Sequence, residues 1–385
     1  MSTSPERYCL GGLMKDIDKE CNPEDLETKD ETQNKSFKDQ KLDSKDSAFP
    51  SNFPATIFSS ALNTRFFSTN IIPEEDIFFQ FTKNNILMAF SSRNSTINLQ
   101  RYLSDASEET IDHIIKELTG MFSVIIKNKN GNYFCSDLLK VCNETQKLKI
   151  LTELSKTLSE DCTDEFGTHP IQNIIEMASK EEEYKLILAS FNDFNNILMA
   201  SLNQNGSFVI QKLIVHIPEQ IRADFNSIFV KLICILSRDM YGVCTVKKFI
   251  GYTKNELIVK QILNTILTNF VNIASNQYGN YLMQYILEKW WKTPEGVFLK
   301  KLIISKFQIL CSNHYSCYLC DLFLKLCTNE EKMILLSSYN NYKTVIKNNN
   351  LKNKIPIGLN KAIFETKEKN GIRENRTDNL NSNNK

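Results

Sequence analysis

Apolar and polar residues recur along this chain at a nearly constant interval. Seven segments align on a marker residue that stands four positions after a small polar residue: SSRNSTINLQRYL, KNKNGNYFCSDLL, TDEFGTHPIQNII, LNQNGSFVIQKLI, RDMYGVCTVKKFI, SNQYGNYLMQYIL and CSNHYSCYLCDLF. The markers are Thr96, Asn132, Thr168, Ser207, Val243, Asn280 and Ser316, and their spacings are 36, 36, 39, 36, 37 and 36 residues. Such an interval predicts an array of helical repeats, in which each unit buries its apolar face against its neighbours.

Each segment has the pattern of an amphipathic helix with a capping residue before it. Four positions before the marker stand Ser92, Asn128, Asp164, Asn203, Asp239, Asn276 and Ser312, all of types that accept hydrogen bonds from a helix start. Apolar residues occupy the positions three, six and seven after the marker, which share one helix face. The marker and the positions one and four after it fall on another face and are mostly polar or aromatic. Each helix therefore presents a second stripe beside the buried one.

Further apolar periodicities predict partner helices, for example over 148–158, 225–236 and 257–270. Antiparallel helix pairs stacked in sequence order would form an all-α solenoid shaped as an arc. An eighth unit, SSYNNYKTVIK, has Asn341 as its marker, but it follows Ser316 by only 25 residues. This unit is expected to be truncated or to lack a full first helix.

The two ends of the chain have a different composition. Residues 1–52 are polar and acidic, residues 359–385 are rich in Asn and Lys, and both segments are predicted to be disordered, flanking a repeat domain over 53–358. Residues 1–50 hold 8 Lys/Arg and 12 Asp/Glu, which leaves 38 basic and 33 acidic residues, a net of +5, in the rest of the chain. This mild excess is compatible with phosphate contact but does not by itself indicate nucleic-acid binding.

The sequence also bears on cellular location. The N-terminus is polar rather than signal-like, and the longest apolar window, 228–236, is interrupted by Lys231 and too short to cross a bilayer. The 11 cysteines form no disulfide framework and fit reduced thiols. We expect a soluble, monomeric, cytoplasmic protein, with the nucleus or nucleolus as the alternative.

The strings NQYGNYLMQYIL, NQNGSFVIQKLI and DEFGTHPIQNII resemble the RNA-reading helices of Pumilio (PUF) repeats, and the resemblance covers about residues 80–350. It implies a right-handed arc of about eight repeats with single-stranded RNA on the concave face. In that family the first and fifth residues of a five-residue block contact a base edge and the second stacks on the base. These residue types suit the task, since amides pair with Watson–Crick edges and rings stack on bases. The N-terminal repeats would face the 3′ side of the RNA.

The resemblance then implies an RNA-binding set for each block. Asn280, Tyr281 and Gln284 resemble a uracil-reading set, whereas Ser207, Phe208 and Gln211 resemble an adenine-reading set. The remaining predicted RNA-binding residues are Thr96, Ile97, Gln100, Asn132, Tyr133, Ser136, Thr168, His169, Gln172, Val243, Cys244, Lys247, Ser316, Cys317, Cys320, Asn341 and Tyr342. The set at Val243 lacks edge-pairing groups, and Lys247 is assigned to either a phosphate or the surface. At Ser316 the family's guanine-reading glutamate is absent, which leaves recognition of a UGU motif open.

Other residue groupings in the sequence bear on functions besides RNA binding. Cys311, His314, Cys317 and Cys320 could suggest zinc, but two of them fall on the repeat register and one rigid helix cannot wrap four ligands around an ion, so no metal or other cofactor is expected. No Gly-rich phosphate loop, HExxH or GxSxG motif indicates an enzyme. The resemblance implies an mRNA 3′ untranslated-region binder that represses translation or promotes decay through partners such as deadenylase components. The alternatives are a nucleolar ribosome-assembly protein and a helical scaffold for peptides.

Overall fold

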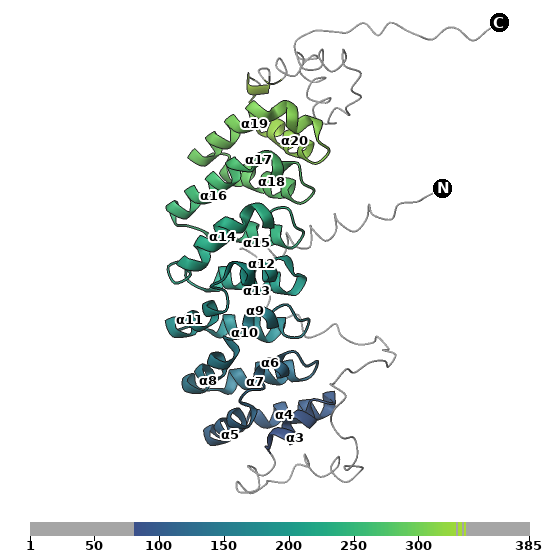
Figure 1. The fold of residues 1–385 in the computed structure, drawn as a ribbon, viewed down its shortest axis with the longest axis vertical. Coiled ribbons are helices and arrows are strands. Elements are labelled where there is room, and N and C mark those ends of the chain that lie inside the picture. The colour runs from purple at the N-terminus through teal and green to yellow at the C-terminus, as the bar shows by residue number, and fades with distance from the viewer. Residues whose placement is uncertain (1–80, 329, 333–334, 336–385) are drawn as a thin grey trace, which may run out of the picture.

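The computed structural model describes residues 81–328, 330–332 and 335, and all regular elements within them are helices (Figure 1). The predicted all-α solenoid is confirmed. None of the helices in this part of the chain has the length and apolar character that crossing a membrane requires. The predicted boundaries at 52 and 358, and the eighth unit with Asn341 and Tyr342, lie outside the described residues.

The helices form two long rows. The marker segments form the inner helices, which are α4 (Arg93–Leu103), α7 (Gly131–Val141), α10 (Thr168–Met177), α13 (Gln204–His216), α15 (Gly242–Tyr252), α18 (Gly279–Trp290) and α20 (Ser316–Leu326). The outer helices are α5 (Glu108–Leu118), α8 (Glu144–Leu154), α11 (Glu181–Ala189), α14 (Ala223–Leu236), α16 (Glu256–Thr268) and α19 (Pro294–Ser312). Consecutive inner helices contact one another, and the stack is gently concave on the side of the inner helices (Figure 1).

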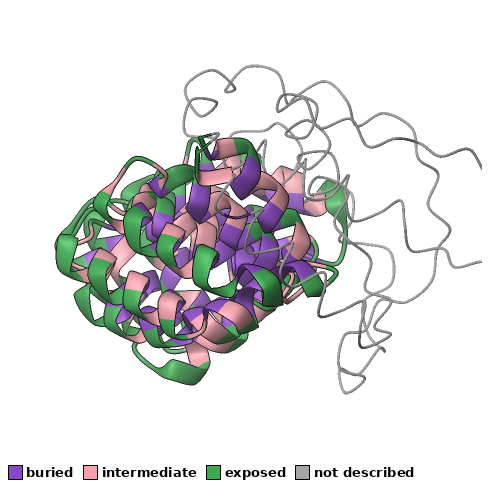
Figure 2. Ribbon diagram, turned by 90° about the horizontal axis from the view of Figure 1, so that it is seen from above, coloured by how far each residue is buried: buried purple, intermediate pink, exposed green. Residues whose placement is uncertain are grey.

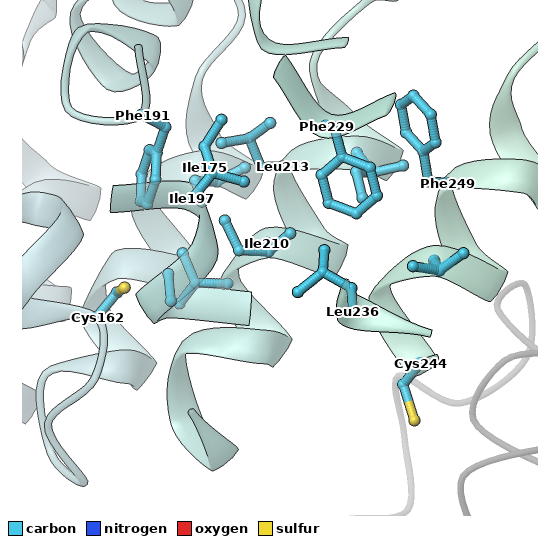
Figure 3. Packing of buried hydrophobic residues seen from close by; sticks show 14 of the residues in the cluster. Cys162, Ile175, Phe191, Ile197, Ile210, Leu213, Phe229, Leu236, Cys244 and Phe249 are labelled. Atoms are coloured by element: carbon cyan, nitrogen blue, oxygen red, sulfur yellow. The ribbon is translucent and has the colours of Figure 1, made fainter. Parts of the chain in front are cut away.

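Shorter helices connect the rows at several repeats. They are α3 (Lys83–Ala89), α6 (Phe122–Ile126), α9 (Leu158–Asp161), α12 (Phe194–Leu202) and α17 (Phe270–Ala274). Figure 2 shows buried residues between the rows and exposed residues on the outer surfaces. The core is continuous from repeat to repeat because side chains of neighbouring units interdigitate, as Phe229 and Phe249 do with ring centroids 4.5 Å apart (Figure 3). This arrangement follows from the apolar stripe, which one unit alone cannot bury.

Most of the predicted caps are confirmed. Five of these side chains accept hydrogen bonds from the backbone N–H groups two and three residues later; Asn276, for example, accepts from Tyr278 at 2.9 Å and from Gly279 at 3.1 Å. The other four are Asn128, Asp164, Asn203 and Asp239. Ser92 caps α4 through the N–H of Ser95. These hydrogen bonds satisfy backbone N–H groups that would otherwise lack partners at the start of six inner helices.

A glycine precedes the marker in five blocks, and the reason is a close backbone approach. A Cβ placed on Gly279 would lie 2.2 Å from the carbonyl oxygen of Ile273 in α17. No carbon atom can occupy that position, so glycine lets the connecting helix pack directly against the start of α18.

Glutamate side chains fasten neighbouring repeats to each other. The Glu153 carboxylate accepts hydrogen bonds from the N–H groups of Gly120 and Phe122, at 2.8 and 3.0 Å, in the preceding repeat. Glu219 accepts from the N–H groups of Lys254 and Asn255 at 3.1 and 3.2 Å. Because these bonds satisfy backbone donors in the connections between helices, they fix how one repeat sits on the next.

Candidate nucleic-acid interface

The inner helices bring the predicted blocks into one row. We number the marker as the first position of a block, so that its second, fifth and sixth positions lie one, four and five residues later. The first and fifth positions are one helical turn apart, as are the second and sixth. Since consecutive inner helices are in contact, equivalent positions of successive blocks lie side by side along the inner face.

Aromatic side chains at the second position protrude from this face. Tyr133, Phe208 and Tyr281 expose 64%, 43% and 42% of their surface, and His169 is also exposed. Exposing a large ring to water brings no gain to the fold, and a row of such rings at the repeat interval has the form of a stacking surface for flat ligands. Ile97 takes this position in the first block and is half-buried.

Hydrogen bonds to nearby backbone carbonyls hold several first-position side chains in place. The side-chain amide nitrogen of Asn280 donates to the carbonyl oxygens of Asn276 and Gln277, at 3.2 and 2.7 Å. Its Oδ1 accepts from Gln284 Nε2 at 3.0 Å, so the two amides form one hydrogen-bonded unit. Asn132 makes the same pair of backbone bonds, at 2.9 and 2.8 Å. The fifth position of the Asn132 block is Ser136, whereas the fifth position of the Asn280 block is Gln284.

Three further blocks retain a glutamine at the fifth position. Gln172 Nε2 donates to Thr168 Oγ1 at 3.2 Å, which repeats the first-to-fifth pairing. The hydroxyl of Ser207 donates to the Gln204 carbonyl at 2.9 Å, and Gln211 is half-buried. In the first block, the Thr96 hydroxyl is buried beside the carbonyls of Ala89 and Ser92.

Gln100, the fifth residue of the first block, donates through Nε2 to Asp137 Oδ2 of the next repeat at 2.5 Å.

The Val243 block differs from the others, as its sequence indicated. Val243 and Cys244 are buried, and the cysteine thiol lies beside the Met240 carbonyl. Lys247 reaches the surface, with its ammonium 5.4 Å from the centroid of the Tyr285 ring in the next repeat. This block therefore presents a cation beside an aromatic ring in place of a paired edge.

The seventh block is displaced by one residue from the predicted register. Asn313, not Ser312, accepts from the N–H groups of Tyr315 and Ser316, at 2.9 and 3.1 Å. Ser312 is the last residue of α19, and its hydroxyl donates to the Gln308 carbonyl. The prediction of Ser312 as the cap is wrong because α19 continues through it.

The buried stripe confirms the displacement. Leu319, Cys320, Phe323 and Leu324 are buried, and they match the buried Leu282, Met283, Ile286 and Leu287 only when Cys317 is aligned with Asn280. Ser316 then occupies the place of Gly279, with its hydroxyl 2.7 Å from the Leu310 carbonyl. The first, second and fifth positions become Cys317, Tyr318 and Asp321. In this register Ser316 and Cys320 take the places of Gly279 and Met283, so they do not form the predicted edge pair.

This displaced block places an aromatic ring and a carboxylate where the prediction had two cysteines. Tyr318 is 50% exposed, as the other second-position rings are, and Asp321 is half-buried. Burial raises the pKa of the Cys317 thiol, so this first position offers a neutral S–H group. The pKa of Cys320 is also raised, chiefly by its hydrogen bond with Cys311. Among the described residues, no three His, Cys, Asp or Glu side chains are grouped as metal ligands would be.

Comparison with known proteins agrees with this geometry. A profile of the Pumilio-family RNA binding repeat matches residues 124–155, 196–224 and 269–290, which contain the Asn132, Ser207 and Asn280 blocks. Pumilio homolog 12 of Arabidopsis thaliana is 28% identical over 202 residues, covering 51% of this chain and 33% of that protein. Suppressor protein MPT5 of Saccharomyces cerevisiae is 25% identical over 198 residues, covering 49% and 23%. The chain thus spans about a third or less of the length of these relatives.

Solved structures show the same fold. The RNA-binding domain of yeast Puf5p bound to AAT2 RNA aligns with a TM-score of 0.62 at 19% identity, covering 73% of this chain and 82% of that one. The Puf4 RNA-binding domain bound to the HO endonuclease RNA 3′ UTR recognition sequence aligns with a TM-score of 0.64 at 18% identity, covering 74% and 88%. Together with the repeat register and the row of exposed rings, these matches show that the chain contains Pumilio-family RNA-binding repeats and has the fold of Pumilio RNA-binding domains.

Proposed function

We propose that this protein binds short single-stranded motifs in the 3′ untranslated regions of mRNAs and lowers their translation or stability through recruited partners. The observation that carries the proposal is the row of exposed second-position rings, each directly after the polar or thiol first position of its block; they are Tyr133, His169, Phe208, Tyr281 and Tyr318. Such a row can stack successive bases, and each stacked base contributes about 1–3 kcal/mol.

The Puf4 structure supports the choice of RNA, since that relative is bound to a 3′ UTR recognition sequence. Repression and decay require no chemistry from the repeats themselves. On this proposal the protein selects the message, and its protein partners, for which we expect deadenylase components, act on it.

In vitro selection of RNA ligands from a random pool by the full chain tests the proposal. We expect a short enriched motif with strongly specified bases separated by tolerant ones, because the Val243 block has no edge pair. A pool without an enriched motif would contradict sequence-specific binding and would favour a peptide scaffold or a protein with weak base preference.

Replacing the two amides of the sixth block gives the first specific prediction. Asn280→Ala combined with Gln284→Ala removes the fixed amide unit but leaves the Tyr281 stacking surface. We expect binding to weaken by about tenfold and base preference to relax at one position of the motif. Fluorescence anisotropy with RNAs carrying each of the four bases at each position measures both effects. Equal loss of preference at every position would rule out the reading of one base per repeat.

The corrected seventh block gives a second prediction. An ionised Asp321 accepts hydrogen bonds but donates none, and guanine is the base whose pairing edge presents adjacent N–H donors. We therefore expect this block to prefer guanine and Asp321→Asn to reduce that preference by about tenfold. Glu288→Gln on α18 is the control, since it removes an exposed carboxylate outside the blocks and should leave every preference unchanged. An unchanged preference in Asp321→Asn would exclude this role.

A further inference from the structure

The Asn132 block retains a first-position amide and an exposed ring but has only a serine at its fifth position. The Ser136 hydroxyl donates to its own helix, at the Asn132 carbonyl, over 3.1 Å. It is 8% exposed and too short to reach a base edge as a glutamine does. By its own residues alone, this block would therefore lack half of its edge pair.

An amide from the next repeat occupies this place. Asn173, the sixth residue of the following block on α10, donates through Nδ2 to Ser136 Oγ at 3.1 Å. The sixth position of one block meets the fifth position of the preceding block at two other junctions, Gln100 with Asp137 and Lys247 with Tyr285. The approach of Asn173 to Ser136 is thus a property of how the repeats stack.

Asn173 also lies on the side of α10 that carries the exposed second-position ring. It stands one helical turn after His169 on the same face of α10, and His169 is the second-position residue that follows Tyr133 along the row. In the sixth block, Gln284 hydrogen-bonds to the first-position side chain of its own block. In the second block, Asn173 donates to the Ser136 hydroxyl, which in turn donates to the backbone carbonyl of Asn132. In both blocks a half-buried carboxamide is thus linked by hydrogen bonds to a first-position asparagine whose side-chain nitrogen is fixed to the backbone, directly through the side chain in the sixth block and through Ser136 and the asparagine backbone in the second.

We propose that Asn173 is a specificity-determining residue that supplies the missing edge group of the preceding block. Asn132, Tyr133 and Asn173 then bind a base with the same edge pattern as the base bound by Asn280, Tyr281 and Gln284, namely a pyrimidine of the uracil type. The inference rests on the proposed RNA-binding function and assigns the second block a reader from outside its own five residues.

The test uses the full chain and a panel of RNAs with all four bases at each motif position. Asn132→Ala first identifies the base read by the second block. Asn173→Leu, which keeps the branched shape of the side chain but removes the amide, should relax preference at that same base by about tenfold. Adding Ser136→Gln to Asn173→Leu supplies a glutamine within the block and should restore the preference. Lys248→Leu is the positional control, because it alters a sixth position whose preceding block has its own Gln211; it should lower affinity without altering base preference.

Two results would overturn the inference: unchanged preference in Asn173→Leu, or relaxation only at the base that Thr168→Ala identifies. In either case, relaxation by the Asn280→Ala and Gln284→Ala pair would show that RNA reading itself still holds. Absence of base preference in the unaltered protein would instead refute the proposed function.

Discussion

Replacing Gly279 with alanine is expected to destabilise the protein by about 3 kcal/mol. The added Cβ would lie 2.2 Å from the Ile273 carbonyl oxygen and 2.9 Å from its carbonyl carbon. These are backbone atoms of α17 and cannot rotate away, so α17 and α18 must separate and open the core between them. Alanine favours a helix over glycine by about 1 kcal/mol, so helix propensity alone predicts the opposite sign. Urea denaturation followed by circular dichroism measures the change.

Gly251→Ala is the matched control for this substitution. Gly251 lies within the neighbouring inner helix α15 and is exposed, and the nearest atom to an added Cβ is the Tyr285 hydroxyl oxygen at 3.2 Å. The flexible Tyr285 side chain can shift slightly to relieve this close contact. The free energy of unfolding of Gly251→Ala should therefore stay within about 0.5 kcal/mol of the parent value or exceed it. Equal stability of the two variants would refute the close-approach explanation for Gly279.

The second large effect is expected at Arg222, whose side chain is almost fully buried. Its Nε donates to the Ile217 carbonyl at 3.1 Å, Nη1 donates to Asn226 Oδ1, and the guanidinium lies 5.9 Å from the Phe249 ring centroid. Burial lowers the pKa of this group. Arg222→Ala would leave buried acceptors without donors and open a cavity, and we expect a loss of about 3 kcal/mol.

Two further variants separate the contribution of packing from that of hydrogen bonding to the stability loss at Arg222. Arg222→Met fills most of the volume but supplies no donor, so it should recover about 1 kcal/mol of the loss. Arg238→Ala removes an exposed arginine whose Nε donates to the Cys234 carbonyl, and it should change stability by less than about 0.5 kcal/mol. Full recovery in Arg222→Met would mean that packing, rather than hydrogen bonding, accounts for the effect. Thermal and urea unfolding of the three variants decide the matter.

Much of the fold could be predicted from the sequence because each repeat is a local pattern. The cap, the apolar stripe and the second polar stripe lie within 12 residues of one another, and six of the seven caps were placed correctly. The seventh failed for a physical reason. The run CYLCDLFLKL is apolar on almost every face of α20, so its periodicity fits either of two registers. Ser312 and Asn313 are both suitable caps, and only the length of α19 decides between them.

The candidate site was less predictable than the fold, because part of it arises between repeats. Nothing within the second block indicates Asn173, which lies 37 residues after Ser136 and meets it only when the helices stack. The contact between Lys247 and Tyr285 has the same origin. A comparison of fifth positions with the sixth position of the following block could have suggested these pairs, but the contact rule itself comes from the geometry of the junction.

The hydrogen bonds that the Glu153 and Glu219 carboxylates accept from neighbouring repeats have a mechanical consequence. They join two pairs of adjacent repeats, and the contacts between consecutive inner helices continue along the described stack. In a stack coupled in this way, local unfolding starts at the ends, because a terminal repeat is stabilised by one neighbour instead of two. An elongated ligand that contacts several blocks would couple repeats that are not neighbours and so would suppress their local unfolding. On this view the length of the bound RNA, and not only its sequence, determines how much of the protein stiffens.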